Sequence, residues 1–121
     1  MINRETGAGS RLLLDSTLRR LGCKSADIIG YDQIAYGHIR AAWHVHSGQA
    51  DYCIATRAAA RVFGLEFFPL VSERFDLVIP KQHAELAATE ILLETLNRAA
   101  FQRELELLGG YDTTQTGKLL A

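Results

Sequence analysis

The chain has 121 residues, of which 48% are hydrophobic, so it can bury a core and global disorder is not expected. Its formal net charge of −1 argues against a broad nucleic-acid-binding surface, which needs a basic excess. No apolar run approaches the ~20 residues of a membrane span, and the N-terminus lacks a signal-peptide pattern. We therefore expect a single cytoplasmic domain over residues 1–121 that binds neither membranes nor nucleic acid.

The first part of the chain predicts a loop, a helix and a short strand. Met1–Arg4 is too short to show strand periodicity. Leu14, Leu18 and Leu21 recur at helical spacing and predict an amphipathic helix over about residues 10–21, with Ser10 or Gly9 as its N-cap and Gly22 as its end. The two isoleucines within Asp27–Tyr31 predict a short strand.

The middle of the chain alternates helix and strand. A second helix is expected over about residues 36–47, and Asp51–Ala55 has the composition of a buried parallel strand. A short helix, Arg57–Phe63, would be capped by Thr56 and ended by Gly64.

The last part predicts two strands and two helices. Glu66–Val71 and Arg74–Ile79 are rich in residues that favour strands, although Pro69 interrupts the first. Helices are expected over residues 83–97 and 98–108, followed by a weakly structured tail. The alternation predicts an α/β fold with three layers, in which helices cover both faces of a mostly parallel sheet of about four or five strands.

The loop between the N-terminal segment and the first helix is the best candidate for a ligand site. The glycines Gly7 and Gly9 allow a ligand to approach the backbone, and the helix start offers free N–H groups. Hydroxyl donors come from Thr6 and Ser10, and positive charge comes from Arg4 and Arg11, which sit at either end of the loop. This set suits a carboxylate or another oxyanion. The alternative is a simple glycine turn with a capping serine, and the Gly-Lys-Ser/Thr ending of a P-loop is missing.

Two further residues lie where a predicted strand ends and a helix begins. His38 begins the second helix and Thr56 precedes the third, and in a parallel sheet these positions share one edge with the glycine loop. His38 could donate to an anion, or it could simply face solvent in the first turn.

The sequence gives little indication of a catalytic or metal-binding site. No nucleophile–base pair stands out, so we do not expect an enzyme. Cys23 and Cys53 lack the spacing of a metal site or a disulfide framework, and His44 and His46 fall on different faces of a helix. We expect reduced thiols and no cofactor.

Several strings resemble a known family. Residues 2–15, with Gly7-Ala8-Gly9-Ser10-Arg11 at their centre, are similar to the "N-R-x-x-G-S-G-T-R-x-L-L-D" opening of the periplasmic-binding-protein-like domain of molybdate-related regulators and of MoeA-like molybdopterin-biosynthesis proteins. Later matches are the "S-G-x-A-D" string at 47–51, the "E-R-Y-D-L-V-I-P" string at 73–80 and the "G-Y-D" string at 110–112.

The resemblance implies one lobe of a type II periplasmic-binding-protein fold. It implies that the chain begins at the crossover into the second lobe and lacks the first lobe and any helix-turn-helix domain. The implied function is sensing of a small anion, with molybdate or tungstate suggested, as the effector part of a transcriptional regulator. An accessory role in molybdenum-cofactor biosynthesis is the alternative. The expected ligand-binding residues are Arg4, Thr6, Gly7, Ala8, Gly9, Ser10, Arg11, His38 and Thr56.

Half of a two-lobed domain would leave apolar hinge surface exposed. Because large apolar patches seek partners, we expect the chain to form a homodimer.

Overall fold

A computed structural model describes residues 1–120, which form two compact units. The first spans Met1–Phe67 and the second runs from Phe68 onward. Each unit is described by itself below. The assignment of the whole chain to one ligand-binding domain stays a prediction.

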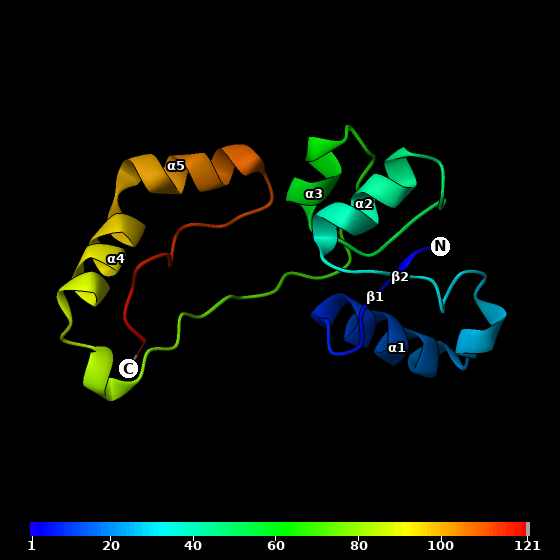
Figure 1. Ribbon diagram of the computed structural model, residues 1–121, viewed down its shortest axis with the longest axis horizontal. Coiled ribbons are helices and arrows are strands. Elements are labelled where there is room, and N and C mark those ends of the chain that lie inside the picture. The colour runs from blue at the N-terminus through cyan, green and yellow to red at the C-terminus, as the bar shows by residue number, and fades with distance from the viewer. Residues whose placement is uncertain (121) are drawn as a thin grey trace. The chain divides into compact units, whose positions relative to one another are not determined.

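The first unit is a small α/β arrangement built on two parallel strands (Figure 1). Strand β1 (Asn3–Arg4) pairs with β2 (Ile34–Ala35), so that Asn3 lies opposite Ile34 and Arg4 opposite Ala35. Helix α1 (Gly9–Leu21) lies on one side of the strands, and α2 (His38–His46) lies on the other beside the short α3 (Arg57–Val62). The predicted α/β character and parallel pairing are confirmed, but a sheet of two strands falls short of the predicted three-layer sheet of four or five.

Helix α1 ends as its sequence predicts and begins differently. Gly22 adopts the left-handed conformation with φ 68°, and the N–H of Cys23 reaches the carbonyl of Leu18 at 2.9 Å, which completes a glycine C-cap. At the start, Ala8 is the N-cap and no side chain caps the helix. The expected capping by Ser10 or Gly9 is wrong, because both residues already lie inside the first turn.

The strand predicted over Asp27–Tyr31 does not form. A 3₁₀ turn, η1 (Ser25–Asp27), leads into consecutive turns, and the side chain of Ile29 is 91% exposed. Gly30, with φ +86°, turns the chain so that the strand begins only at Ile34. Two adjacent isoleucines favour a strand only when a neighbouring strand accepts them, and here the turn leaves Ile29 in solvent and Ile28 half-buried.

The strand predicted over Asp51–Ala55 is reduced to an extended segment. One hydrogen bond links it to the first strand, from the N–H of Ile2 to the carbonyl of Tyr52 at 3.1 Å. The segment then enters α3, where the hydroxyl of Thr56 accepts the N–H of Ala59 at 3.4 Å. The predicted N-cap of α3 is therefore confirmed.

The core of the first unit consists of small side chains. Ile2, Ala35 and Ala41 form the buried cluster, and Val45 and Cys53 pack against it. Burial raises the pKa of the Cys53 thiol, because the thiolate is poorly solvated there. Alanines at the start of α2 and in α3 let these helices approach closely, so little large apolar surface is buried.

The second unit contains the helices predicted near the C-terminus. The turn η2 (Lys81–His83) precedes α4 (Ala87–Asn97), which is followed by α5 (Ala99–Leu108). The buried Thr89 donates its hydroxyl to the carbonyl of His83 at 2.7 Å. The tail is held in place by polar contacts, since Asn97 donates to the carbonyl of Gly117 at 3.2 Å and Thr113 bonds the carboxylate of Glu106.

The two strands predicted at Glu66–Val71 and Arg74–Ile79 are also absent. Among residues 1–120, no backbone hydrogen bond involves residues 66–79, although the chain there is extended. A strand exists only with a partner, and this stretch has none in the described chain.

Gly30 offers a test of the packing around the N-terminus. A Cβ at this position would overlap the carbonyl oxygen of Met1 and lie 2.8 Å from the Met1 nitrogen, whereas a Cβ at Gly48 would meet nothing. Both glycines have positive φ, so Gly48→Ala carries the backbone strain alone. We expect Gly30→Ala to lower the free energy of unfolding by about 2 kcal/mol more than Gly48→Ala. Urea unfolding followed by the fluorescence of Trp43, the one tryptophan in the sequence, measures this difference, and equal effects would contradict the packing.

Candidate functional site

The candidate site lies where the two parallel strands end. Arg4 closes β1 and Ala35 closes β2, and the parallel register places these residues opposite each other. Short loops lead from them to the first residues of α1 and α2. The starts of both helices therefore lie at the same edge of the sheet, which is where α/β proteins bind ligands.

Arg4 is the central residue of this edge. Its side chain is only 9% exposed and forms a two-pronged ion pair with Glu5, with Nε 2.8 Å from Oε2 and Nη2 2.9 Å from Oε1. The hydrogen bonds to Glu5 raise the pKa of the guanidinium above its ordinary value. Such paired, parallel bonds fix the plane of the arginine as well as its charge.

The third contact of Arg4 joins the two strand ends. Arg4 Nη1 lies 2.8 Å from Nδ1 of His38, the first residue of α2. Because arginine can only donate, His38 Nδ1 accepts this bond, and the ring hydrogen lies on Nε2. Arg4 and His38, which are both predicted ligand-binding residues and lie 34 positions apart in the sequence, are thus in direct contact.

Glu5 lies between the guanidinium of Arg4 and the start of α2. Its carboxylate receives two hydrogen bonds from Arg4 and faces the N–H of Gly37, the N-cap of α2, at 3.4 Å. These bonds, led by those from Arg4, lower the pKa of Glu5 from 4.5 to about 2. The chain therefore holds its own carboxylate, charged at neutral pH, between an arginine and a helix start.

Arg11 supports the same edge from α1. Its Nη1 donates to the carbonyl oxygen of Arg4 at 3.2 Å, and its guanidinium carbon lies 4.9 Å from the centre of the Tyr31 ring. Tyr31 in turn donates its hydroxyl to Asp15 of α1 at 2.7 Å. Arg11 thus adds positive charge beside β1 while it is held by a carbonyl and an aromatic face.

The glycine loop leaves its donors available. Thr6 and Gly7 are exposed, and Gly7 has φ +89°, which favours glycine. The N–H groups of Gly9 and Ser10 belong to the first turn of α1, and no hydrogen bond within residues 1–120 uses them. The half-buried Ser10 hydroxyl likewise forms no hydrogen bond within this described part.

Thr56 is not drawn into this network. Its hydroxyl caps α3, and no hydrogen bond within residues 1–120 links Thr56 to Arg4 or Arg11. Of the predicted ligand-binding residues, Arg4 contacts both Arg11 and His38 in the structure. The glycine loop follows Arg4 in the sequence. The role of Thr56 as a ligand stays a prediction.

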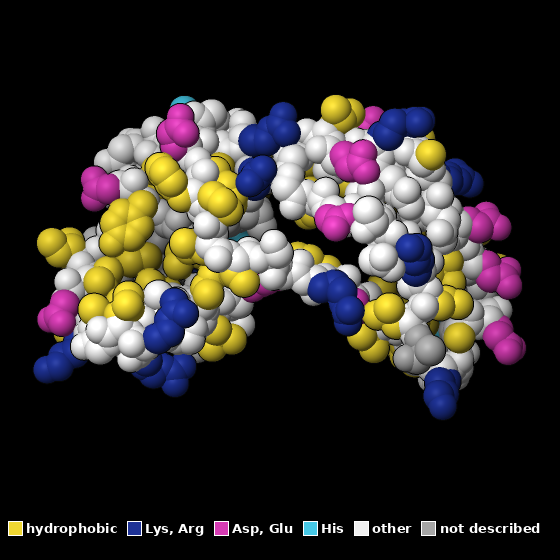
Figure 2. Space-filling view, turned by 180° about the vertical axis from the view of Figure 1, so that it is seen from behind, with side chains coloured by type: hydrophobic (Ala, Val, Ile, Leu, Met, Phe, Trp, Pro, Cys, Tyr) yellow, Lys and Arg dark blue, Asp and Glu magenta, His cyan; other side chains and the backbone are white. Residues whose placement is uncertain are grey.

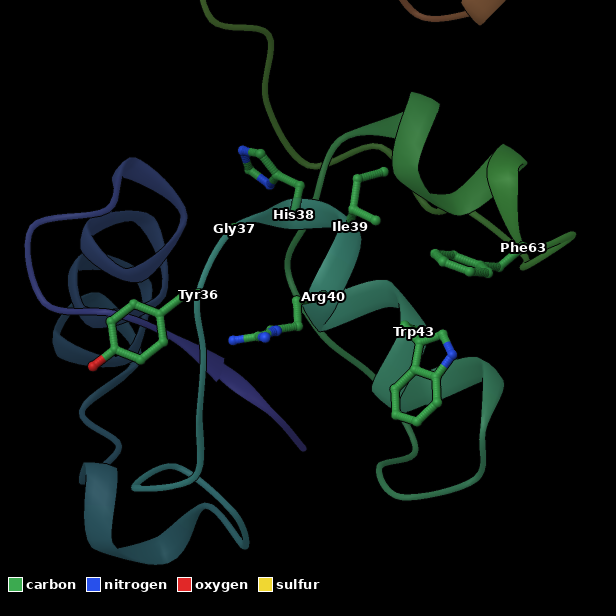
Figure 3. A pocket seen from close by; sticks show the side chains of 7 residues that line it. All are labelled: Tyr36, Gly37, His38, Ile39, Arg40, Trp43 and Phe63. Atoms are coloured by element: carbon green, nitrogen blue, oxygen red, sulfur yellow. The ribbon is translucent and has the colours of Figure 1, made fainter.

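An open pocket adjoins the site on the side of α2. Its volume is about 480 Å³, and it shares His38 with the polar edge. Figure 3 shows the ring of Phe63, from the end of α3, pointing toward Ile39 and Trp43 of α2. The lining residues are Tyr36, Gly37, His38, Ile39, Arg40, Trp43 and Phe63.

Sequence reasoning missed three contributors to this edge: Glu5, Tyr31 and Gly37. Glu5 lies in the sequence between Arg4 and Thr6, which are both predicted ligand-binding residues. Because Glu5 is acidic, its residue type does not indicate an anion site. The position of Gly37 before His38 gave a signal, because a glycine at a helix start can present its N–H to a carboxylate. Tyr31 could be placed beside Arg11 only after the turn at Gly30 was known.

The described part of the chain has no cluster of side chains suited to bind a metal ion. Within residues 1–120, no group of three or more histidine, cysteine, aspartate or glutamate side chains could hold a metal ion. None of the helices in this same part is long and apolar enough to cross a bilayer.

The family of the chain follows from comparison with known proteins. Residues 1–97 match the model of the PBP superfamily domain, which covers the whole first unit and the start of the second. The chain belongs to this family. Membership of the PBP superfamily indicates a ligand-binding role, while molybdate specificity is not part of what the match shows.

Two relatives of this PBP superfamily chain are uncharacterized proteins. "Uncharacterized protein YvgK" of Bacillus subtilis (strain 168) is 41% identical over 120 residues, which are 99% of this chain and 38% of that protein. The "Uncharacterized protein in ferredoxin 2Fe-2S gene 5'region" of Clostridium pasteurianum is 36% identical over 110 residues, which are 90% of this chain and 97% of that protein. No solved structure matches the chain.

The Arg4–Glu5 pair makes a direct prediction for titration. Because the folded pKa of Glu5 is about 2, below its ordinary 4.5, the pair stabilises the fold above pH 4.5, and this contribution is lost as the pH falls toward 2. NMR titration of the Glu5 side-chain carboxyl should give a midpoint near 2. An Arg4→Met variant should move that midpoint up toward 4.5, and an unchanged midpoint would contradict the pair.

Proposed function

We propose that the chain binds a small oxyanion at the edge where β1 and β2 end. The ligand would accept hydrogen bonds from the N–H groups of Gly9 and Ser10 and from the Ser10 hydroxyl. Arg11 and Arg4 would supply the positive charge. The resemblance of residues 2–15 suggests molybdate or tungstate as the first anions to test.

The observation that carries this proposal is the contact between Arg4 and His38. It brings the ends of both strands, and with them the starts of two helices, to one point of the surface. Each helix start presents unpaired N–H groups and a partial positive charge. Each charge-assisted hydrogen bond there can contribute roughly 1.5–3 kcal/mol, so a few of them suffice to bind a small anion.

The carboxylate of Glu5 would compete with an external anion for the same hydrogen-bond donors. Its carboxylate already takes two hydrogen bonds from Arg4 and one from Gly37. A ligand that reaches Arg4 must therefore displace this carboxylate or share the arginine with it. Competition with this carboxylate for the same donors lowers the affinity and favours a ligand that is a stronger hydrogen-bond acceptor than a carboxylate.

A second candidate ligand is a small organic anion with an apolar group. The pocket beside His38 is lined by aromatic and aliphatic side chains and, at about 480 Å³, exceeds the needs of a four-oxygen anion. A carboxylate or phosphate held at the polar edge could place its apolar part on Trp43 and Phe63. Quenching of Trp43 fluorescence by such a ligand, but not by an inorganic oxyanion, would distinguish the two.

We also propose a role for the chain as a whole. The chain would be a cytoplasmic sensing module without catalytic activity, whose occupancy biases an attached effector such as a DNA-binding segment of a regulator. Because the chain spans 38% of the Bacillus subtilis relative, the activity and partners of a longer protein belong to this proposal.

Calorimetric titration of the purified chain with molybdate, tungstate, sulfate and phosphate tests the site. At least one should bind, and Ser10→Ala should weaken that binding about tenfold, because the hydroxyl donor at the helix start is lost. Arg98→Ala, at the N-cap of α5 in the second unit, is the control and should bind like the unmodified chain. Equal binding by both variants, or no binding of any anion, would count against this site.

Glu5→Gln tests the competition between the resident carboxylate and the ligand. The glutamine keeps the shape of the side chain and removes its charge, so the affinity for the same oxyanion should rise several-fold to about tenfold. Glu66→Gln, an exposed position in the same unit, controls for the change in net charge and should have little effect. A weaker affinity in Glu5→Gln would show that the carboxylate supports the site instead of competing for it.

A further inference from the structure

The segment over residues 66–79 exposes several large apolar side chains to solvent. The side chains of Phe68, Phe75 and Val78 are 81%, 77% and 87% exposed. None of the backbone N–H and C=O groups of this stretch forms a backbone hydrogen bond within residues 1–120. Both features are those of a strand without its sheet.

The accessible surface of the chain is larger than that of a compact protein of the same mass. It amounts to 9134 Å², whereas a compact protein of 13.4 kDa exposes about 6,500 Å². Even two separate compact bodies of the sizes of the two units would expose only about 7,800 Å² in total. The excess over these two compact bodies is about 1,300 Å², which is more than the roughly 800 Å² that each partner buries in a standard protein–protein interface. Hydrophobic side chains open to solvent are visible across the face in Figure 2.

The segment Val71–Ile79 has the alternation of a strand with one apolar face. Residues with odd numbers place Val71, Phe75, Leu77 and Ile79 on one face, which only Glu73 interrupts. Residues with even numbers place Ser72, Arg74 and Asp76 on the other, with Val78. Arg74 and Asp76 already lie on one side of the chain, because their side chains pair at 2.9 Å.

We propose that two copies of this chain pair through Val71–Ile79 as antiparallel strands centred on Phe75. In this register Arg74 of each copy lies opposite Asp76 of the other, so two ion pairs flank a central pair of phenylalanines. Val71 lies opposite Ile79 at both ends. The backbone groups of alternate residues, which form no backbone hydrogen bond within residues 1–120, then bond across the interface.

The charges select this register from its neighbours. A shift by two residues in either direction places Arg74 opposite Arg74 or Asp76 opposite Asp76, and like charges directly opposite each other destabilise the pair. A shift by one residue places the apolar face of one strand beside the polar face of the other. A parallel in-register pair repeats the like-charge contacts. A second copy is therefore the occupant whose charges the segment matches.

Sedimentation equilibrium on the full chain tests the pairing by charge reversal. The unmodified chain should sediment at twice 13.4 kDa at tens of micromolar. Asp76→Arg alone, or Arg74→Asp alone, creates two like-charge contacts and should raise the dimer dissociation constant at least tenfold. The double variant R74D/D76R restores opposite charges and should return within about threefold of the original value. Arg103→Asp, on the exposed face of α5, is the matched control and should leave the dimer unchanged.

Cysteine cross-linking locates the centre of the interface independently. In a C23S/C53S background, Phe75→Cys places two sulfurs at the two-fold axis, where the Cα atoms of facing residues are about 4.5–5.5 Å apart, and it should form an intermolecular disulfide. Val78→Cys should not, because its two copies would lie about 20 Å apart. Circular dichroism of each variant confirms that the helices remain.

Three outcomes would overturn the proposal. The chain could be monomeric at tens of micromolar, which would leave the segment for a strand of another polypeptide. The dimer could persist in both single charge reversals, which would place the contact elsewhere. The disulfide could form through Val78→Cys and not through Phe75→Cys, which would show a different register.

Discussion

The buried guanidinium of Arg4 is the interaction on which the first unit depends. A charge with so little contact with water is tolerated only when its donors are matched by acceptors. Glu5 takes two of them and His38 a third, while the carbonyl of Arg4 receives Arg11. These bonds tie the end of β1 to the starts of both α1 and α2. In a unit whose core consists largely of alanines, this polar cluster fixes the positions of the elements as much as apolar packing does.

The same cluster is the basis for the proposal that this edge binds an anion. The sheet is too short to hold a ligand between two covered faces, so the donors at the strand ends and helix starts have to act together. The carboxylate of Glu5 holds Arg4 in place through two hydrogen bonds. In the proposed binding, an oxyanion would compete with this carboxylate for Arg4, so the affinity would depend on the difference between the two anions as well as on the number of donors.

The helices could be predicted from the sequence, but most of the strands could not. Periodic leucines and a following glycine define α1 locally, and Thr56 defines the start of α3, because both signals act within one turn of the chain. The strands depend on partners. Ile28 and Ile29 have the composition of a strand, yet the turn at Gly30 moves the pairing to Ile34. The segment from residue 66 to 79 reads as two strands and remains unpaired in the single chain.

The candidate site was predicted in part for the same reason. The donors of the glycine loop and the two arginines could be recognised by residue type, and His38 by its place after a strand. The role of Glu5 could not, since an acidic residue beside an arginine is more often a surface ion pair than the occupant of an anion site. Thr56 was grouped with the others on the assumption of a wider parallel sheet, which residues 51–55 do not provide.

Amide shift mapping tests the anion site most directly. In a titration of the ¹⁵N-labelled chain with molybdate, we expect saturable shifts centred on the amides of Gly9, Ser10 and Gly37, with those of α4 and α5 unchanged. Saturable shifts confined to the second unit, or no shifts with molybdate, tungstate, sulfate or phosphate, would contradict it.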